Sequence, residues 1–209
     1  MKAESMLLDR HFSSREGGRV HLLVLHTTEG AGSLEELRSI FEGEEASSHY
    51  GIDAAGRIAQ FVRDQDKAWT QCNFNPVCLS AEQVAFAEFS RAHWFRERHA
   101  QLEGSAIWLA YGHIQYGVPL RPGKVEGGGI VHDGVVQHSD LGLIGCGHSD
   151  CGDGYPEGYV ILLARYYIAH HLHPKAPYTL RLVREINNIR QHHGVPLLDN
   201  VAVPAIVSR

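Results

Sequence analysis

The sequence lacks the features of several protein classes. It has no apolar run near the roughly 18 residues that a membrane helix requires, and its N-terminal stretch offers only Met6-Leu7-Leu8 as an apolar core, too short for a signal peptide. It has no basic cluster, and its formal net charge is −5, which argues against nucleic acid as a partner. We therefore expect a chain without a membrane span that is synthesised in the cytoplasm without a signal peptide.

Cysteine is scarce, whereas histidine is abundant. The chain has four cysteines and no Cys-x-x-Cys pair, so a four-cysteine zinc ribbon is excluded. The spacings of Cys72 to Cys78 and of Cys146 to Cys151 would allow two local disulfides, but free thiols are expected in a cytoplasmic chain. The 15 histidines are many, and His is both the commonest metal ligand and the usual proton-transfer residue.

Length and periodicity predict one soluble domain with strands and helices. The chain has 209 residues, of which 44% are hydrophobic and 21% charged, as in ordinary globular proteins. Short apolar runs predict strands, and longer periodic segments predict helices. Ser33 is a candidate cap for the first helix, and Gly194 a candidate stop for the last. The predicted strands are 20–25, 49–53, 57–62, 78–86 and 135–137, and the predicted helices are 33–41, 97–116, 156–171 and 179–193. This mixture indicates an α/β or α+β fold around a central sheet.

Three side chains of types that can bind metals follow apolar strands or lie in a glycine-rich loop. His26 directly follows an apolar strand, His138 follows a second one, and Asp150 lies in a glycine-rich loop. Each is unremarkable alone, since most such side chains are merely solvated or cap an element. A catalytic zinc site, however, needs three protein ligands of these types and one open position for water.

Five motifs in order contain these residues. They are His26-Thr27-Thr28-Glu29-Gly30, Ser47-Ser48-His49-Tyr50-Gly51-Ile52-Asp53, Ala68-Trp69, Asn75-Pro76-Val77-Cys78-Leu79-Ser80-Ala81-Glu82, and His138-Ser139-Asp140-Leu141 with His148-Ser149-Asp150-Cys151-Gly152. Over about residues 20–170, the sequence resembles the zinc-dependent N-acetylmuramoyl-L-alanine amidases of phage lysins, bacterial amidases and peptidoglycan recognition proteins. The resemblance implies an α/β fold, with a central mixed β-sheet flanked by helices in a single domain.

The resemblance assigns roles to individual residues. His26, His138 and Asp150 would bind one Zn²⁺ ion, and Glu82 would activate the water bound there. His148 stands where relatives usually carry a lysine that stabilises the oxyanion. Cys151 is a second candidate for the last ligand, because thiolates bind zinc well, but Asp150 occupies the matching position.

The implied substrate is peptidoglycan, cleaved between the lactyl group of N-acetylmuramic acid and L-alanine. Trp69 is expected to form a groove wall that stacks on sugar or peptide, or else to be a core aromatic, and Tyr50 has the same two interpretations. His49 is expected to line the groove or to be structural. Ser48 stands where some relatives have a catalytic tyrosine.

The implied organisation is an N-terminal extension (1–19), the zinc amidase domain (20–174) and a C-terminal helical appendage (175–209), in a monomer. A chain of this kind would reach the cell wall after holin-type release or through a dedicated secretion system.

Two alternatives remain open at this point. The same fold could recognise peptidoglycan without cleaving it, although a binder has no need of a complete set of His26, His138, Asp150 and Glu82. A thiol hydrolase could use Cys78 or Cys146, but neither cysteine lies at a predicted helix start beside an evident base.

The histidine at position 148 leads to a prediction about pH. An imidazole loses its proton near neutral pH, whereas a lysine ammonium keeps it. We therefore expect activity on purified cell walls to fall above about pH 7 to 8, more steeply than in a lysine-bearing relative. A flat rate from about pH 6 to 9 would contradict the role of His148.

Overall fold

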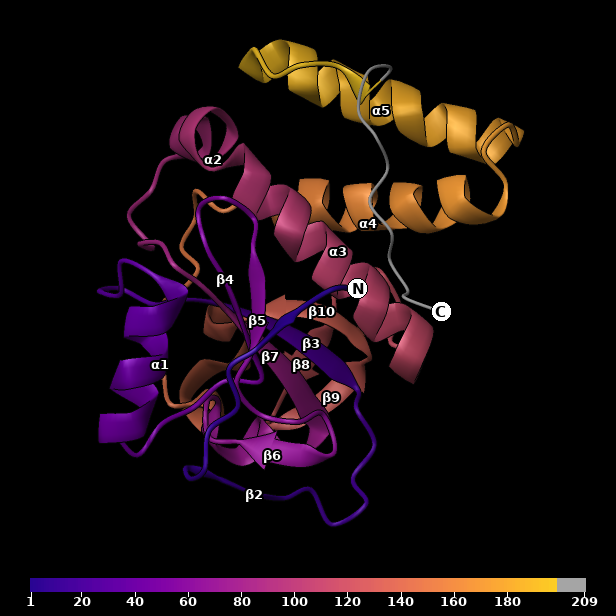
Figure 1. Ribbon diagram of the computed structural model, residues 1–209. Coiled ribbons are helices and arrows are strands. Elements are labelled where there is room, and N and C mark those ends of the chain that lie inside the picture. The colour runs from indigo at the N-terminus through magenta and orange to yellow at the C-terminus, as the bar shows by residue number, and fades with distance from the viewer. Residues whose placement is uncertain (199–209) are drawn as a thin grey trace.

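A mixed six-stranded sheet forms the centre of the molecule (Figure 1). The computed structural model describes residues 1–198. In spatial order the strands are β1 (Glu4–Ser5), β5 (Ile58–Gln60), β4 (Tyr50–Ile52), β7 (Cys78–Gln83), β3 (Leu22–Thr27) and β10 (Gly134–Gln137). Only the β4–β5 pair is antiparallel, because a tight turn between Asp53 and Arg57 joins these two strands. The expected α/β fold with a central mixed sheet is confirmed.

The alternation of side chains along β3 separates the two faces of this sheet. Leu23 and Leu25 belong to the large core beneath the long helices, whereas Leu22 and Val24 belong to a smaller cluster on the opposite face. Successive side chains of a strand point to opposite faces. His26 therefore shares the face of Leu22 and Val24.

Strands β7 and β10 follow the same rule. Cys78 and Val136 lie in the smaller cluster, so Glu82 of β7 and His138, directly after β10, are placed on that face too. The sheet register pairs His26 with Glu82. Because β3, β7 and β10 are parallel, their carboxyl ends meet at one edge of the sheet, where ligands bind in open α/β folds.

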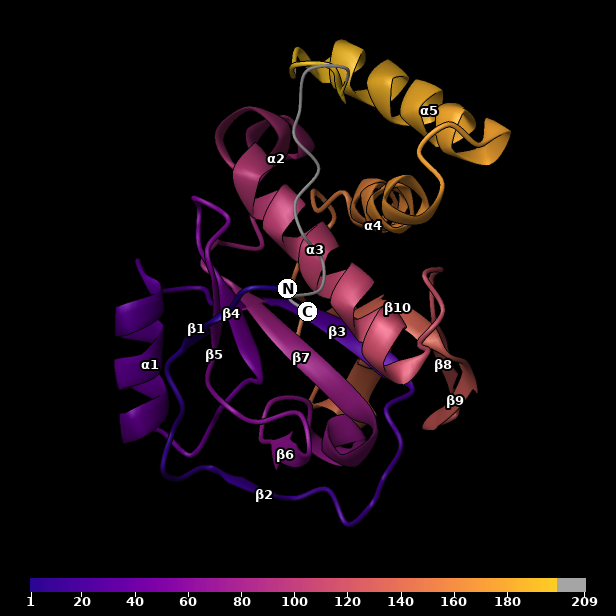
Figure 2. The ribbon, with the colours of Figure 1, turned by 45° about the vertical axis from the view of Figure 1, so that its right-hand side comes forward.

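Helices stack in layers on the other face (Figure 2). Helix α3 (His99–Tyr116) crosses the sheet and is preceded by α2 (Arg91–Glu97); α4 (Glu157–Leu172) packs on α3, and α5 (Pro177–His193) packs on α4. Gly112 allows the close approach of α3, because a Cβ there would lie 2.6 Å from the side chain of Leu23. None of the helices in the described part of the chain is both long and apolar enough to span a bilayer.

Shorter elements surround the carboxyl edge of the sheet. Helix α1 (Leu34–Gly43) begins at its predicted cap, where Ser33 Oγ accepts a hydrogen bond from the Glu36 amide. The 3₁₀ segments η1 (Cys72–Val77) and η2 (His138–Gly145) cover the smaller cluster, and β2 (Phe12–Ser14) pairs with β6 (Asp66–Ala68). A hairpin of β8 (Lys124–Glu126) and β9 (Gly129–His132) lies beside η2.

The two predicted flanking segments are integrated into this fold. Residues 1–19 supply β1 and β2, and the buried Arg15 guanidinium donates to the carbonyls of Asp64, Asp66, Pro76 and Cys78. The predicted appendage forms α5, and its buried Arg190 donates to Tyr159 of α4 and Glu103 of α3. Both segments therefore pack as parts of one domain; the remainder of the predicted appendage, 199–209, lies outside the described residues.

Glu157, the first residue of α4, makes the stability of this fold dependent on pH. Burial, and then the negative charge of Asp140, raises the pKa of Glu157 from 4.5 to about 7. An acid whose pKa is raised in the native state stabilises that state below its unfolded pKa and loses this contribution as pH rises through the folded value.

We therefore expect Glu157→Gln to leave stability nearly unchanged at about pH 4 and to increase it by about 1–2 kcal/mol at pH 8. The gain is smaller than the full pKa shift implies, because a helix N-terminus favours a carboxylate. Urea unfolding at both pH values measures the effect, with Glu97→Gln at an exposed position of α2 as the control. An equal effect at both pH values would contradict it.

Candidate active site

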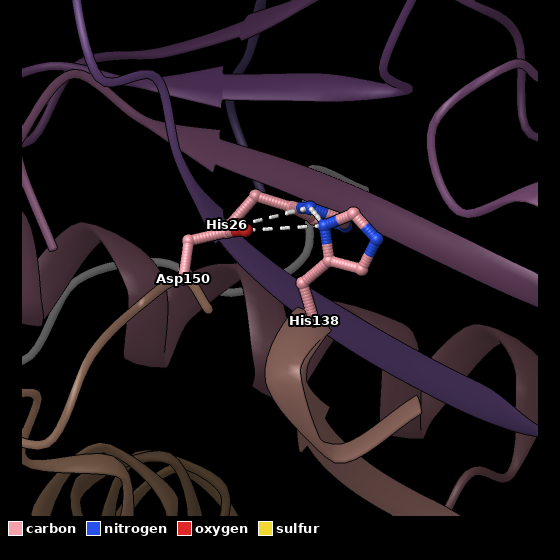
Figure 3. Close-up of side chains that lie close together, drawn as sticks. All are labelled: His26, His138 and Asp150. Atoms are coloured by element: carbon pink, nitrogen blue, oxygen red, sulfur yellow. Dashed lines mark hydrogen bonds and ion pairs between the residues drawn. The ribbon is translucent and has the colours of Figure 1, made fainter. Parts of the chain in front are cut away.

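Two histidines and one aspartate converge at the carboxyl edge of the sheet (Figure 3). His26 Nδ1 lies 3.0 Å from His138 Nδ1 and 3.4 Å from a carboxylate oxygen of Asp150, and His138 Nδ1 lies 3.2 Å from the other oxygen. All three side chains are buried. The structure thus brings together three residues separated by up to 124 positions in the chain, as the motifs predicted.

The contacts of these three residues favour unprotonated nitrogen and oxygen atoms that face the centre of the cluster. His138 Nε2 donates to the Gly145 carbonyl at 2.7 Å, so the neutral ring presents an unprotonated Nδ1 to Asp150. Burial lowers the pKa of His26 to about 4, which also favours its neutral form. Burial alone would raise the pKa of Asp150, but the adjacent His138 and His26 side chains hold it well below its ordinary value.

This set of donors fits a divalent metal ion. Ligand atoms about 2.0–2.1 Å from a tetrahedral zinc ion lie about 3.3 Å from one another, and the three measured separations are 3.0, 3.2 and 3.4 Å. Neutral imidazoles and a carboxylate are ligands that Zn²⁺ prefers. The cluster is also braced by the Thr27 amide, which donates to Asp150 at 3.3 Å.

Glu82 lies beside the cluster without belonging to it. Its Oε1 is 3.8 Å from His26 Nδ1, because the register of β3 and β7 places the two residues opposite each other. Burial, followed by the charges of Asp150 and Glu29, raises the pKa of Glu82 well above its usual range. A carboxylate with a raised pKa beside a reacting water is suited to accept a proton.

His148 occupies the exposed rim of the same site. Its ring stacks on that of His138, with centroids 4.4 Å apart, and its Nδ1 is 3.9 Å from Asp150. With 59% of its side chain exposed, it is accessible to a substrate. Asp140, two residues after His138, does not join the cluster; it accepts a hydrogen bond from the Gln137 amide and caps η2.

A cleft of about 360 Å³ opens over these residues. The cluster and Glu82 line this cleft, together with Leu37, Ile40 and Phe41 of α1 and with Trp69. Trp69 is 36% exposed, and its indole Nε1 donates to Ser13 at 3.2 Å. Trp69 is therefore an aromatic side chain held at the cleft, and its stacking on a substrate stays a prediction.

The predicted substrate contacts of His49 and Tyr50 are corrected by the structure. His49 is completely buried, where its ring contacts Ser80 Oγ and the Arg15 guanidinium. Tyr50 is also buried, and its hydroxyl donates to Asp64 at 2.7 Å. Neither residue lines the cleft. Arg15 and Ser80 cover the His49 ring, and the Tyr50 ring packs beside Trp108 and Tyr111.

The cysteines also differ from expectation. Cys72 and Cys146 form a disulfide across 74 positions, rather than free thiols or local pairs. Cys78 is buried, and this burial raises the pKa of its thiol to about 12, so neither proposed nucleophile of a thiol hydrolase is available. The Cys151 side chain is buried in the large core, where its thiol contacts Gln83, and it does not belong to the group of converging ligand atoms that contains Asp150.

One residue of the cleft was not recognised as a candidate. Glu29 lines the cleft at the end of the His26 motif, where it accepts hydrogen bonds from the Thr27 hydroxyl and the Ala87 amide. Its φ of 56° is in the left-handed region, which non-glycine residues seldom adopt. The available signal was its position, three residues after His26 at the end of a buried strand.

The comparison with known proteins identifies the family. A family model described as N-acetylmuramoyl-L-alanine amidase matches residues 16–153. The chain belongs to this amidase family. The match contains every residue of the cluster and ends before α4, so the amidase motifs and the observed cleft occupy the same part of the chain.

Solved structures of amidases share the fold. The Staphylococcus aureus hydrolase AmiA, solved with its ligand, superposes with a TM-score of 0.64 at 19% identity over 85% of this chain and 88% of its own. AmpD gives a TM-score of 0.57 at 15% identity over 77% and 93%. The endolysin of the Thermus scotoductus bacteriophage Ph2119 gives 0.53 at 15% over 77% and 99%. No curated protein matches in sequence.

The amidase cluster leads to a prediction about metal binding. Loss of a partner of a metal ligand already weakens metal affinity about 10–100-fold, so we expect His26→Ala, His138→Ala or Asp150→Ala to weaken Zn²⁺ binding by more than about 100-fold. Cys151→Ala is the control and should retain the affinity. Competition with a chromophoric chelator measures both, and equal losses in Cys151→Ala and Asp150→Ala would refute the assignment.

Proposed function

We propose that this amidase binds one Zn²⁺ ion through His26, His138 and Asp150 and hydrolyses peptidoglycan. The bond cleaved would be the amide between the lactyl group of N-acetylmuramic acid and the L-alanine of the stem peptide. The observation that supports this proposal is the convergence of the three donors, at the spacing of a tetrahedral site, on the floor of an open cleft.

Amide hydrolysis needs a nucleophile stronger than water at neutral pH. When bound, Zn²⁺ supplies this by lowering the pKa of water to about 7 and by polarising the scissile carbonyl. Two neutral imidazoles and one carboxylate leave a net charge of about +1 on the centre, which preserves this Lewis acidity.

Glu82 would move the proton. Its carboxylate, adjacent to His26, would accept a proton from the attacking water and deliver it to the nitrogen of the leaving L-alanine. Such general acid–base transfer typically contributes about 10²- to 10⁴-fold in rate. The largely buried position of Glu82 keeps bulk water from competing for that proton.

His148 and Trp69 would act on the substrate itself. The exposed His148 ring is positioned on the rim, next to His138, and would donate a hydrogen bond to the carbonyl oxygen as it becomes negative. Trp69, which also lines the cleft, would stack on a sugar or on the peptide. The pair would align the amide across the floor of the cleft.

A role in the lysis of bacterial walls follows from the same proposal. The substrate lies in the wall, and structures of similar fold include endolysins of Clostridium intestinale and of the Thermus scotoductus bacteriophage Ph2119. We propose an endolysin role on these grounds. The alternative of a binding module without activity is disfavoured by the presence of Glu82 beside a full set of ligands.

The test is digestion of purified peptidoglycan followed by mass spectrometry of the products. We expect free stem peptides that begin with L-alanine, no product after exhaustive chelation, and recovery on addition of Zn²⁺. Glu82→Gln should retain zinc and wall binding but lose at least about 100-fold in rate.

Two outcomes would contradict the proposal. Binding to the wall without release of peptides would indicate the inactive module. Activity that survives chelation but is lost on thiol alkylation would indicate a different hydrolase.

A further inference from the structure

The disulfide between Cys72 and Cys146 connects the two chain segments that form the amidase site. Cys72 begins η1, which leads directly into β7 and Glu82. Cys146 follows η2, the segment that begins with His138 and precedes Asp150. The covalent link therefore joins the start of the strand that carries the proposed base to the loop between two of the proposed metal ligands.

We propose that this disulfide is a redox-sensitive clamp that positions the metal ligand His138 through the carbonyl of Gly145. The clamp rests on the proposed zinc function. Gly145, Cys72 and Cys146 are positioning residues, since none of them is expected to contact the metal ion or the substrate.

The first step is the contact between His138 and Gly145. The Gly145 carbonyl accepts the His138 Nε2 proton at 2.7 Å, and it belongs to the residue immediately before Cys146. This bond fixes the tautomer and the orientation of the ring, as partners of metal-binding histidines generally do. Displacement of Cys146 would therefore move the group that aims Nδ1 at the metal.

The second step is the weak attachment of the loop that contains Gly145. Between positions 142 and 149, Gly145 is the only buried residue, and Leu143 is 92% exposed. The backbone bonds of Cys146 and Gly147 return to Leu143 and Gly142 of the same loop. Packing of the Ile144 side chain near Gly128 is a contact with another exposed segment. The disulfide is thus the strongest connection of this loop to the body of the protein.

The third step is the rigidity of η1, the segment that carries Cys72 at the other end of the disulfide. Asn75 Oδ1 in η1 accepts hydrogen bonds from the Thr70 and Gln71 amides, and buried Arg15 donates to the carbonyls of Pro76 and Cys78. Segment η1 is therefore a fixed anchor. The disulfide joins the exposed loop to this anchor through Cys146, the residue that follows Gly145.

Both cysteines are exposed at the surface, so a dithiol can reach the bond. Attack by its thiolate breaks the S–S bond through a mixed disulfide; two electrons and two protons pass to the protein to give two thiols, and the dithiol is oxidised to its own disulfide. The released loop would then lose its anchor, and Gly145 would no longer hold His138. We expect zinc affinity to fall about 10- to 100-fold.

The test compares zinc dissociation constants of the full chain, measured by competition with a chromophoric chelator. Oxidised wild type, wild type reduced by a dithiol, and the Cys72→Ser/Cys146→Ser variant are measured, with the dithiol removed before titration and the thiols blocked by alkylation. We expect the last two to bind zinc about 10–100-fold more weakly and to show a lower kcat. The dithiol should have no effect on the double variant, and Cys78→Ala should respond like wild type.

A second control separates positioning from general stabilisation, since a disulfide also stabilises a fold by restricting the unfolded chain. Ile186→Ala removes a fully buried side chain from α5, remote from the cleft, and should lower Tm without weakening zinc binding. Equal zinc affinity in the oxidised and reduced wild type would overturn the clamp, as would a similar loss in Ile186→Ala. If the oxidised wild type binds no zinc, the proposed function fails and the clamp with it, whereas the first two outcomes leave the zinc proposal intact.

Discussion

The alignment of three parallel strands is the constraint on which the rest of the structure depends. Strands β3, β7 and β10 are parallel and in register, and the two-residue period of each strand brings His26, Glu82 and His138 to one face at one edge. A shift of any strand by one residue would turn its functional side chain into the opposite core. The apolar alternation that specifies the register, with Leu23 and Leu25 toward the helices, therefore also specifies the site. Folding and function are determined by the same side-chain pattern.

At this edge of the sheet, burial disfavours the charged forms of the titratable side chains that lie close together. Two imidazoles and the carboxylates of Asp150 and Glu82 are brought close together with little water, and desolvation penalises each charged form. The pKa shifts show this effect. Burial lowers the pKa of His26, which favours its neutral form, and raises the pKa of Glu82, which favours its protonated form. A divalent cation would resolve it, because the cation compensates the carboxylates and occupies the imidazole electron pairs. The burial and clustered side chains that make this site unfavourable without a cation would therefore also favour the binding of a metal ion.

The sequence predicted those features that depend on local pattern. The helix start at Ser33, the strand predicted at 20–25 and the family motifs all correspond to observed elements, because apolar period and capping are local properties. The features that depend on tertiary packing were not predictable in this way. His49 lies in a motif but is buried by Arg15, a residue of the supposed extension. The partner of Cys72 lies 74 positions away, and sequence spacing favours near neighbours because it carries no information about which segments meet in space.

One face of the sheet carries the candidate site, and the other face carries the long helices. On one face, small segments such as η1 and η2 and the loop around Gly145 hold the donors at the cleft, and several of these residues are exposed. On the other face, α3, α4 and α5 stack in layers (Figure 2) and contribute to the large core, and hydrophobic burial is the main favourable contribution to folding. The family match ends at residue 153, before α4 begins, so the outer helices add mainly to the stabilising face. A stable helical face allows the opposite edge to keep a cluster of buried polar groups that would destabilise a smaller domain, since the cost of those groups is small against the area buried elsewhere.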